Sequence, residues 1–76
     1  SAMDLHIVDD ETPAGTVNDV NTDFTLAHVP NPASSLKVYV NGQRMRITTD
    51  YTFSGGTISF VTAPPTGSIL LVDYRQ

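Results

Sequence analysis

Basic side chains concentrate in one short part of the sequence, where the chain could recognise a partner. Three of the four basic residues lie between positions 37 and 46. They are Lys37, Arg44 and Arg46, and Tyr39 lies among them. Ammonium and guanidinium groups bind anions, and tyrosine is a common anchor at protein interfaces. Two interpretations stay open. The residues form a docking face for an acidic neighbour or an anionic glycan, or they form a solvated strand face that pairs with local carboxylates.

The residue types needed for catalysis are present, but their spacing is not that of a catalytic site. Nucleophilic catalysis needs a base beside the nucleophile and a third group that orients the base. The two histidines, His6 and His28, are far apart and lie in no such motif. Gly55-Gly56 leads into a predicted strand, whereas a phosphate-binding loop leads into a helix N-terminus. We therefore expect no enzyme, no catalytic residue and no cofactor.

Two acidic segments are the candidates for a metal site. Residues 19–23 place oxygen ligands at alternate positions, as a calcium loop does. However, Phe24 stands where that loop needs glycine, and Pro30 stands where it needs glutamate. The run Asp9-Asp10-Glu11 could attract a hard cation, but short acidic runs are usually solvated. We interpret the first segment as a polar turn and the second as a solvated strand end or linker, and we predict no metal site.

The segment that carries the basic residues is predicted to be a β-hairpin. Leu36–Val40 and Gln43–Ile47 flank Asn41-Gly42, a dipeptide that favours the two-residue type I′ turn. This turn pairs Val40 with Gln43 and, further along, places Lys37 opposite Arg46. The apolar face then contains Leu36, Val38, Val40, Met45 and Ile47, and the outer face contains Lys37, Tyr39, Arg44 and Arg46. Turn chemistry and hydrophobic alternation predict the same register.

A second hairpin is predicted around Gly55-Gly56. Its register sets Tyr51 against Phe60 and Phe53 against Ile58 on an apolar face. The opposite face contains the hydroxyls of Thr52, Ser54, Thr57 and Ser59. This hairpin is expected to belong to the core scaffold.

The remaining strands are predicted from shorter patterns. Ser68–Tyr74 is apolar on both faces at its start, which indicates an interior strand or an outer face that another chain covers. Phe24–Leu26 alternates as a strand, with residues 15–20 as its expected hairpin partner, and Leu5–Val8 is expected at an edge. The sequence thus predicts an all-β fold. It is a small antiparallel β-sandwich, immunoglobulin-like in size, of six or seven short strands.

Length and composition limit the class of protein. The 76 residues can form one domain, which we assign to residues 4–76, and Ser1–Met3 is expected to be the remnant of an expression tag. The net charge of −4 argues against a nucleic-acid partner. No apolar run is long enough to predict a membrane span. The chain has no cysteine, which excludes disulfides and thiolate metal sites.

The order of these elements resembles a small β-sandwich module of bacteriophage and prophage tail, fibre and other virion proteins. The resemblance covers residues 12–74. The residues that carry it are Gly15–Asn18, Phe24–Leu26, Leu36–Arg44, Asp50–Thr52, Ile58–Phe60, Ala63–Pro65, Gly67 and Val72–Tyr74. It implies a non-enzymatic structural or interaction module, cut from a larger virion protein. Its partners would be other virion subunits, with a possible homo-oligomer through the parent protein. Its location would be the virion, after expression in the bacterial host cytoplasm.

The alternative function is a carbohydrate- or host-surface-binding module. The ligand would then contact the Tyr39 face, or the loops Asn31–Ser35 and Pro64–Gly67, for which Asn31, Ser34 and Thr66 are the candidate residues. Glycan-binding modules usually present several coplanar aromatic rings. This chain has no tryptophan, and most of its other aromatic residues are predicted to point inward.

Overall fold

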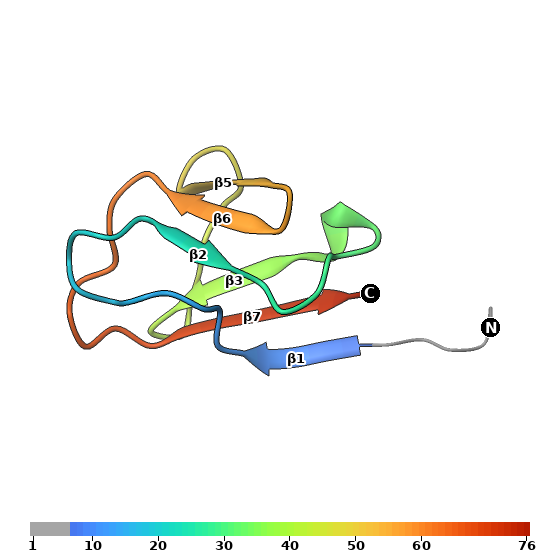
Figure 1. Cartoon of the computed structure of the whole chain (residues 1–76), viewed down its shortest axis with the longest axis horizontal. Helices are drawn as coiled ribbons and strands as arrows, with labels where there is room; N and C mark the ends of the chain where they lie inside the picture. Colours follow the sequence, from blue (N-terminus) through green and yellow to red (C-terminus); the bar gives the residue numbers. More distant parts are fainter. Residues whose placement is uncertain (1–6) are drawn as a thin grey trace.

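The chain forms two antiparallel sheets, as Figure 1 shows for the computed structural model, which describes residues 7–76. Its strands are β1 (Ile7–Glu11), β2 (Asp23–Thr25), β3 (Lys37–Val40), β4 (Gln43–Arg44), β5 (Tyr51–Ser54), β6 (Thr57–Phe60) and β7 (Leu70–Arg75), with a short 3-10 helix η1 (Ala33–Ser35) before β3. One sheet has the order β1-β7-β3-β4 and the other has the order β2-β6-β5. The predicted all-β sandwich is confirmed. Ser1–Met3, which the sequence predicts to be a tag remnant, and Leu5 and His6 lie outside the described residues.

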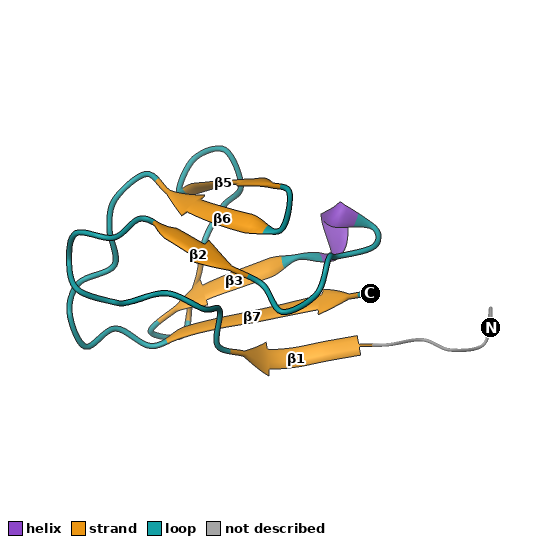
Figure 2. Ribbon diagram, viewed as in Figure 1, coloured by secondary structure: helices purple, strands orange, loops and turns teal. Residues whose placement is uncertain are grey.

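The core lies between the two sheets, which appear as two layers in Figure 2. Its ten buried side chains are Phe24, Leu26, Leu36, Val38, Tyr51, Ile58, Phe60, Leu70, Val72 and Tyr74. The Phe24 and Phe60 rings pack edge to face, with centroids 5.7 Å apart. Such pairs contribute beyond the area they bury. The core is therefore built from alternate residues of strands in both sheets.

Both predicted hairpin turns are confirmed. Asn41 and Gly42 have φ values of 52° and 82°, and Gly55 and Gly56 have 57° and 84°. Positive φ at both central residues is the requirement of a type I′ turn, which asparagine and glycine meet at low cost. The Gly55-Gly56 hairpin keeps the predicted register from end to end, with Tyr51 opposite Phe60.

The last strand is central in its sheet, and its second face is not covered by the described residues. β7 lies between β1 and β3, and it forms antiparallel pairs with both. Its side chains alternate, so that Leu70, Val72 and Tyr74 are buried while Leu71 and Asp73 are half-buried on the other face. β1 occupies an edge of this sheet, as expected for the segment ending at Val8, and continues to Glu11.

The prediction that residues 15–20 form the hairpin partner of β2 is wrong. β2 pairs with β6, and upstream there is one isolated bridge, between Ala14 and Thr25. Gly15 explains the difference, because its backbone packs against the ring of Phe24. A Cβ at Gly15 would lie 2.5 Å from Cδ2 of Phe24. The backbone at Gly15 covers a core aromatic ring. A residue with a side chain at this position could not approach the ring so closely.

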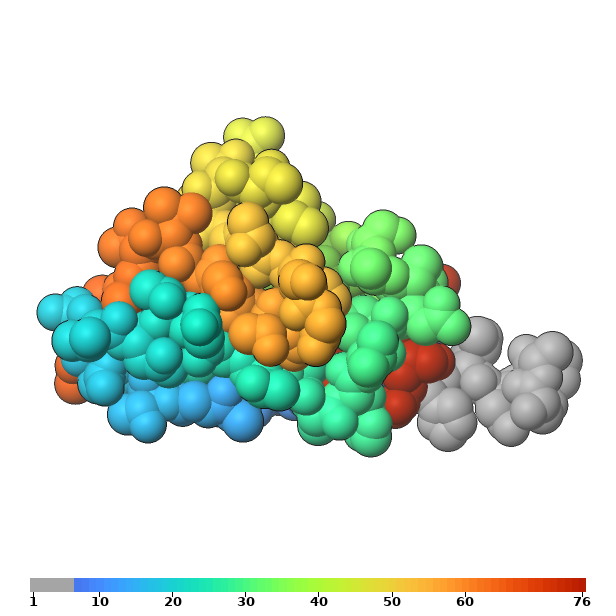
Figure 3. Space-filling model, turned by 45° about the horizontal axis from the view of Figure 1, so that its top comes forward, coloured from blue at the N-terminus to red at the C-terminus, as the bar shows by residue number. Residues whose placement is uncertain are grey.

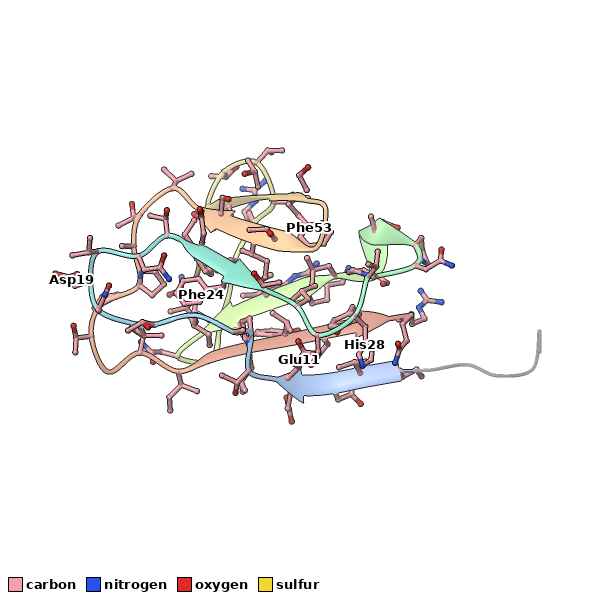
Figure 4. All side chains as sticks on the ribbon, in the orientation of Figure 1. Glu11, Asp19, Phe24, His28 and Phe53 are labelled. Atoms are coloured by element: carbon pink, nitrogen blue, oxygen red, sulfur yellow. The ribbon has the colours of Figure 1, made fainter. Side chains whose placement is uncertain are left out.

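Glu11 is not the solvated strand end that was predicted. It is half-buried, and its Oε1 accepts a hydrogen bond of 2.6 Å from the Tyr74 hydroxyl. Its Oε2 accepts one of 2.9 Å from the backbone N–H of Ala27. The Tyr74 oxygen in turn accepts a bond of 3.1 Å from the backbone N–H of His28. Glu11 and His28 therefore lie close together beside β1 (Figure 4), and this clamp joins β1, β7 and the segment after β2.

Replacing Tyr74 with phenylalanine tests the clamp. Tyr74→Phe removes the donor to a carboxylate and the acceptor for His28, so we expect the free energy of unfolding to fall by about 1.5–3 kcal/mol. Urea denaturation measures this loss. A double-mutant cycle with Glu11→Gln should give a coupling energy above about 0.5 kcal/mol, and additive losses would show that the two groups do not interact.

The clamp also predicts a loss of stability at high pH. Burial, followed by the hydrogen bond to Glu11, raises the pKa of the Tyr74 hydroxyl from 10.0 to about 12. Between these values the folded chain retains a proton that the unfolded chain has released. The stabilisation is therefore complete below pH 10 and is lost as the pH rises through 12. Urea denaturation at several pH values should show this decline, and a decline of the same size in Tyr74→Phe would contradict the assignment.

Candidate functional site

The first hairpin opens soon after its turn. Tyr39 pairs with Arg44 as predicted, and the Met45 N–H donates a bond of 2.8 Å to the Val38 carbonyl oxygen. β4 nevertheless ends at Arg44. The predicted pairs Lys37–Arg46 and Leu36–Ile47 do not form, so the predictions of a direct like-charge pair and of Ile47 in the apolar core are wrong. Ile47 is 57% exposed.

Asp50 holds the chain in a turn directly after the hairpin opens. Its carboxylate Oδ2 accepts a hydrogen bond of 2.8 Å from the Arg46 N–H, and its own N–H donates one of 2.8 Å to the Arg46 carbonyl oxygen. These bonds close a turn over residues 46–50, in which Thr48 has φ of 68°. Beyond Arg44 the chain therefore follows this turn and does not continue the pairing with β3. The segment projects from the molecule, as its yellow atoms show in Figure 3.

A groove of about 580 Å³ lies where the two arms of the hairpin separate. Its lining residues are Ala33, Ser34, Leu36, Lys37, Arg44, Met45, Arg46, Ile47 and Tyr51. Three of them are cationic and none is acidic. We call this the basic groove. It combines positive side chains with an apolar floor, which is the composition of a site for an anionic group attached to an apolar one.

The floor of the basic groove is continuous with the protein core. Leu36 and Tyr51 are buried, and Met45 is half-buried and packs against the core. Burial raises the pKa of the Tyr51 hydroxyl, and the positive charge of Arg44 opposes that rise. The guanidinium of Arg44 is therefore close enough to act on the phenol. Because its floor belongs to the core, the groove has a fixed shape on one side.

Of the four residues of the predicted docking face, Tyr39 and Arg44 lie directly opposite each other, and three of the four line the basic groove. Lys37, Arg44 and Arg46 line the basic groove, but Tyr39 does not. Tyr39 lies opposite Leu71 on the outer face of the four-stranded sheet. Lys37 is paired in register with Asp73 on β7, which places a local carboxylate beside it.

The candidate loops lie at opposite ends of the sandwich, as Figure 1 shows. The Asn31 N–H donates a bond of 2.6 Å to the Arg75 carbonyl oxygen, which fixes the first loop beside the end of β7. Thr66 belongs to the turn between β6 and β7, at the other end. Ser34 alone joins the basic groove, because its carbonyl oxygen accepts a bond of 3.1 Å from Lys37 Nζ. The two loops cannot contact one small ligand together.

A second, smaller cavity lies on the other side of Met45. Its volume is about 220 Å³, and it lies between Val40, Met45 and the Pro64-Pro65 segment. Its lining includes the carboxylate-bearing residue Asp50 and none of the basic residues. The cavity therefore does not share the charge of the basic groove.

Residues 19–23 form a hydrogen-bonded turn. The side chain of Asn18 accepts bonds from the N–H groups of Val20 and Asn21, at 3.0 and 2.8 Å. The side-chain amide of Asn21 donates a hydrogen bond of 2.9 Å to the Asp23 carbonyl oxygen. Asp19, at the tip of this turn in Figure 4, has φ of 70°. Over residues 7–76, no three His, Asp or Glu side chains are placed to hold a metal ion together.

Sequence reasoning missed the floor of the groove, because it placed Leu36, Met45 and Tyr51 inside a closed core. One signal was present: Asp50 follows Arg46 by four residues, and aspartate often accepts backbone N–H bonds in turns. In the described part of the chain, no helix combines the length and apolar character needed to cross a bilayer.

Comparison of the chain with known protein families, with curated proteins and with solved structures finds no match.

Replacing Asp50 with alanine tests the origin of the groove. Asp50→Ala leaves the Arg46 N–H without its carboxylate acceptor, and we expect the free energy of unfolding to fall by about 1 kcal/mol. Asp50→Asn retains one side-chain oxygen and should lose less. Urea denaturation compares the two variants, and equal losses would show that the side-chain acceptor is not the stabilising group.

Proposed function

We propose that this chain is a non-enzymatic structural and interaction module of a bacteriophage or prophage virion protein, associated with the tail or a fibre. The observation that supports it best is the outer face of the four-stranded sheet. Tyr39 and Leu71 lie directly opposite each other there, and both are half-buried. Ile69 comes two residues before Leu71 and is 62% exposed. Apolar side chains on an uncovered sheet face are typical of a surface that packs against another subunit.

The partner, in this proposal, is a neighbouring virion subunit. The apolar residues of the outer face are flanked by charged ones, Lys37 and Asp73 in register on β3 and β7. An apolar centre with a charged rim is the usual anatomy of a protein interface. The same subunit contacts would allow homo-oligomers through the parent protein.

The alternative, a carbohydrate- or host-surface-binding module, has less support. The chain has six aromatic residues, and five of them are buried in the core or pack against it. Tyr39 is the one that remains for a sugar. A single ring among charged side chains is a poor stacking platform.

The proposal is tested on virus particles from the strain that carries the gene. Antibodies raised against this domain should label purified particles at the tail or fibre in immunogold electron microscopy. If neither intact nor disrupted particles are labelled, the virion assignment is contradicted. Labelling of the host surface alone would contradict it as well.

The packing face is tested by a charge placed on it in the parent gene. Ile69→Asp should lower the yield of infectious particles by tenfold or more, because it buries a carboxylate in the subunit contact. Thr52→Asp is the matched control, since Thr52 is exposed on the hydroxyl face of the second hairpin. Equal yields from the two variants would remove the outer face from the interface.

A further inference from the structure

We propose that the basic groove binds an acidic segment of a partner protein. Carboxylates of that segment would lie on Lys37, Arg44 and Arg46, and one of its aliphatic side chains would lie on the groove floor. The inference deepens the proposed function, on which it rests, because it names the chemistry of a docked partner. The groove borders the outer sheet face at Lys37, but its floor is formed by other residues.

The charge of the groove is the first argument. The chain carries a net charge of −4, yet three of its four basic side chains line this one groove and no acidic residue does. The fold brings Lys37 of β3 near Arg46, although the two are not paired in register. A concentrated positive site attracts anionic partners. A single arginine guanidinium can bind a carboxylate through two parallel hydrogen bonds.

The floor of the groove is the second argument. Leu36, Met45 and Tyr51 form an apolar base, and Ile47 stands at its margin, 57% exposed. Covering the exposed Ile47 with an aliphatic side chain is favourable, because it removes apolar surface from water. A volume of about 580 Å³ holds a few side chains and not a folded domain. An acidic peptide segment with one aliphatic residue can pair its carboxylates with the cations and pack its aliphatic side chain on the apolar floor.

The same floor argues against a sugar as the occupant. Sugars are recognised through the open face of an aromatic ring, and the aromatic residue in this groove is Tyr51. It is 3% exposed, so its ring has no free face to offer. The rest of the floor is aliphatic, which favours a peptide side chain.

The test is a titration of the ¹⁵N-labelled chain, followed by NMR, with a capped five-residue peptide that alternates glutamate and valine. Amide signals of residues 36–38 and 44–47 should shift. The double variant Arg44→Gln/Arg46→Gln should bind about three- to tenfold more weakly, because each exposed ion pair contributes modestly. Arg75→Gln is the matched control, since Arg75 is the one basic residue outside the groove lining, and its affinity should change less than twofold. The spectra also report that each variant is folded.

A second variant and a second peptide separate charge from the apolar contact. Ile47→Ser should weaken binding of the alternating peptide, and it leaves the cations in place. A peptide with glutamine for glutamate should bind at least fivefold more weakly than the acidic one. Weak binding of both peptides in 0.5 M salt would agree with an electrostatic site.

Several outcomes would overturn the proposal. These are shifts confined to other surfaces, no shifts at all, equal binding of the glutamine peptide, and an equal effect of Arg75→Gln. Shifts at the groove with 3′-sialyllactose, and none with the peptide, would assign it to an anionic glycan. None of these results bears on whether the domain is found in virus particles, so this proposal can fail while the proposed function stands.

Discussion

The hydroxyl of Tyr74 joins three segments that are far apart in the sequence. It donates to Glu11 on β1 and accepts from the backbone of His28, while Tyr74 itself is on the interior strand β7. A chain of 76 residues without cysteine buries little surface and has no covalent cross-link. The long-range order of the sandwich therefore depends on the core together with a few well-placed polar bonds. This clamp fixes the edge strand β1 to the sheet, and it holds the crossing segment that carries the chain from one sheet to the other.

The sequence contained the local geometry of the fold. Each type I′ turn needs two residues with positive φ. Asn41-Gly42 and Gly55-Gly56 are dipeptides that adopt this conformation readily, so they predict the turns. Once the turn is fixed, the register of the adjacent strands follows from the alternation of apolar residues. Long-range pairing was harder to predict. β2 pairs with β6, more than thirty residues away, and short strands of three residues have no pattern that identifies a distant partner.

The candidate site was predicted in its residue types and not in its shape. Lys37, Arg44 and Arg46 do gather, but in a groove between two separating arms and without Tyr39. Alternation predicts a hairpin as long as the pattern persists, and the pattern persists to Ile47. In the structure the hairpin ends earlier, because the chain enters the turn that the bond from the Arg46 N–H to Asp50 closes. The aspartate four residues after Arg46 was the one sign of this turn in the sequence, and alternation alone does not reveal it.

The short β4 strand links the site to the stability of the free chain. Edge strands with long rows of unpaired backbone groups invite pairing with other molecules, and proteins limit this by keeping such strands short or by placing charges on them. β4 has two residues, and Arg44, a basic residue of the groove, is one of them. Longer pairing, up to Ile47, would close the groove and would also present a flat apolar edge to solvent. The same early end of the strand therefore protects the edge and opens the groove. A sequence change that extends the pairing would affect both properties together.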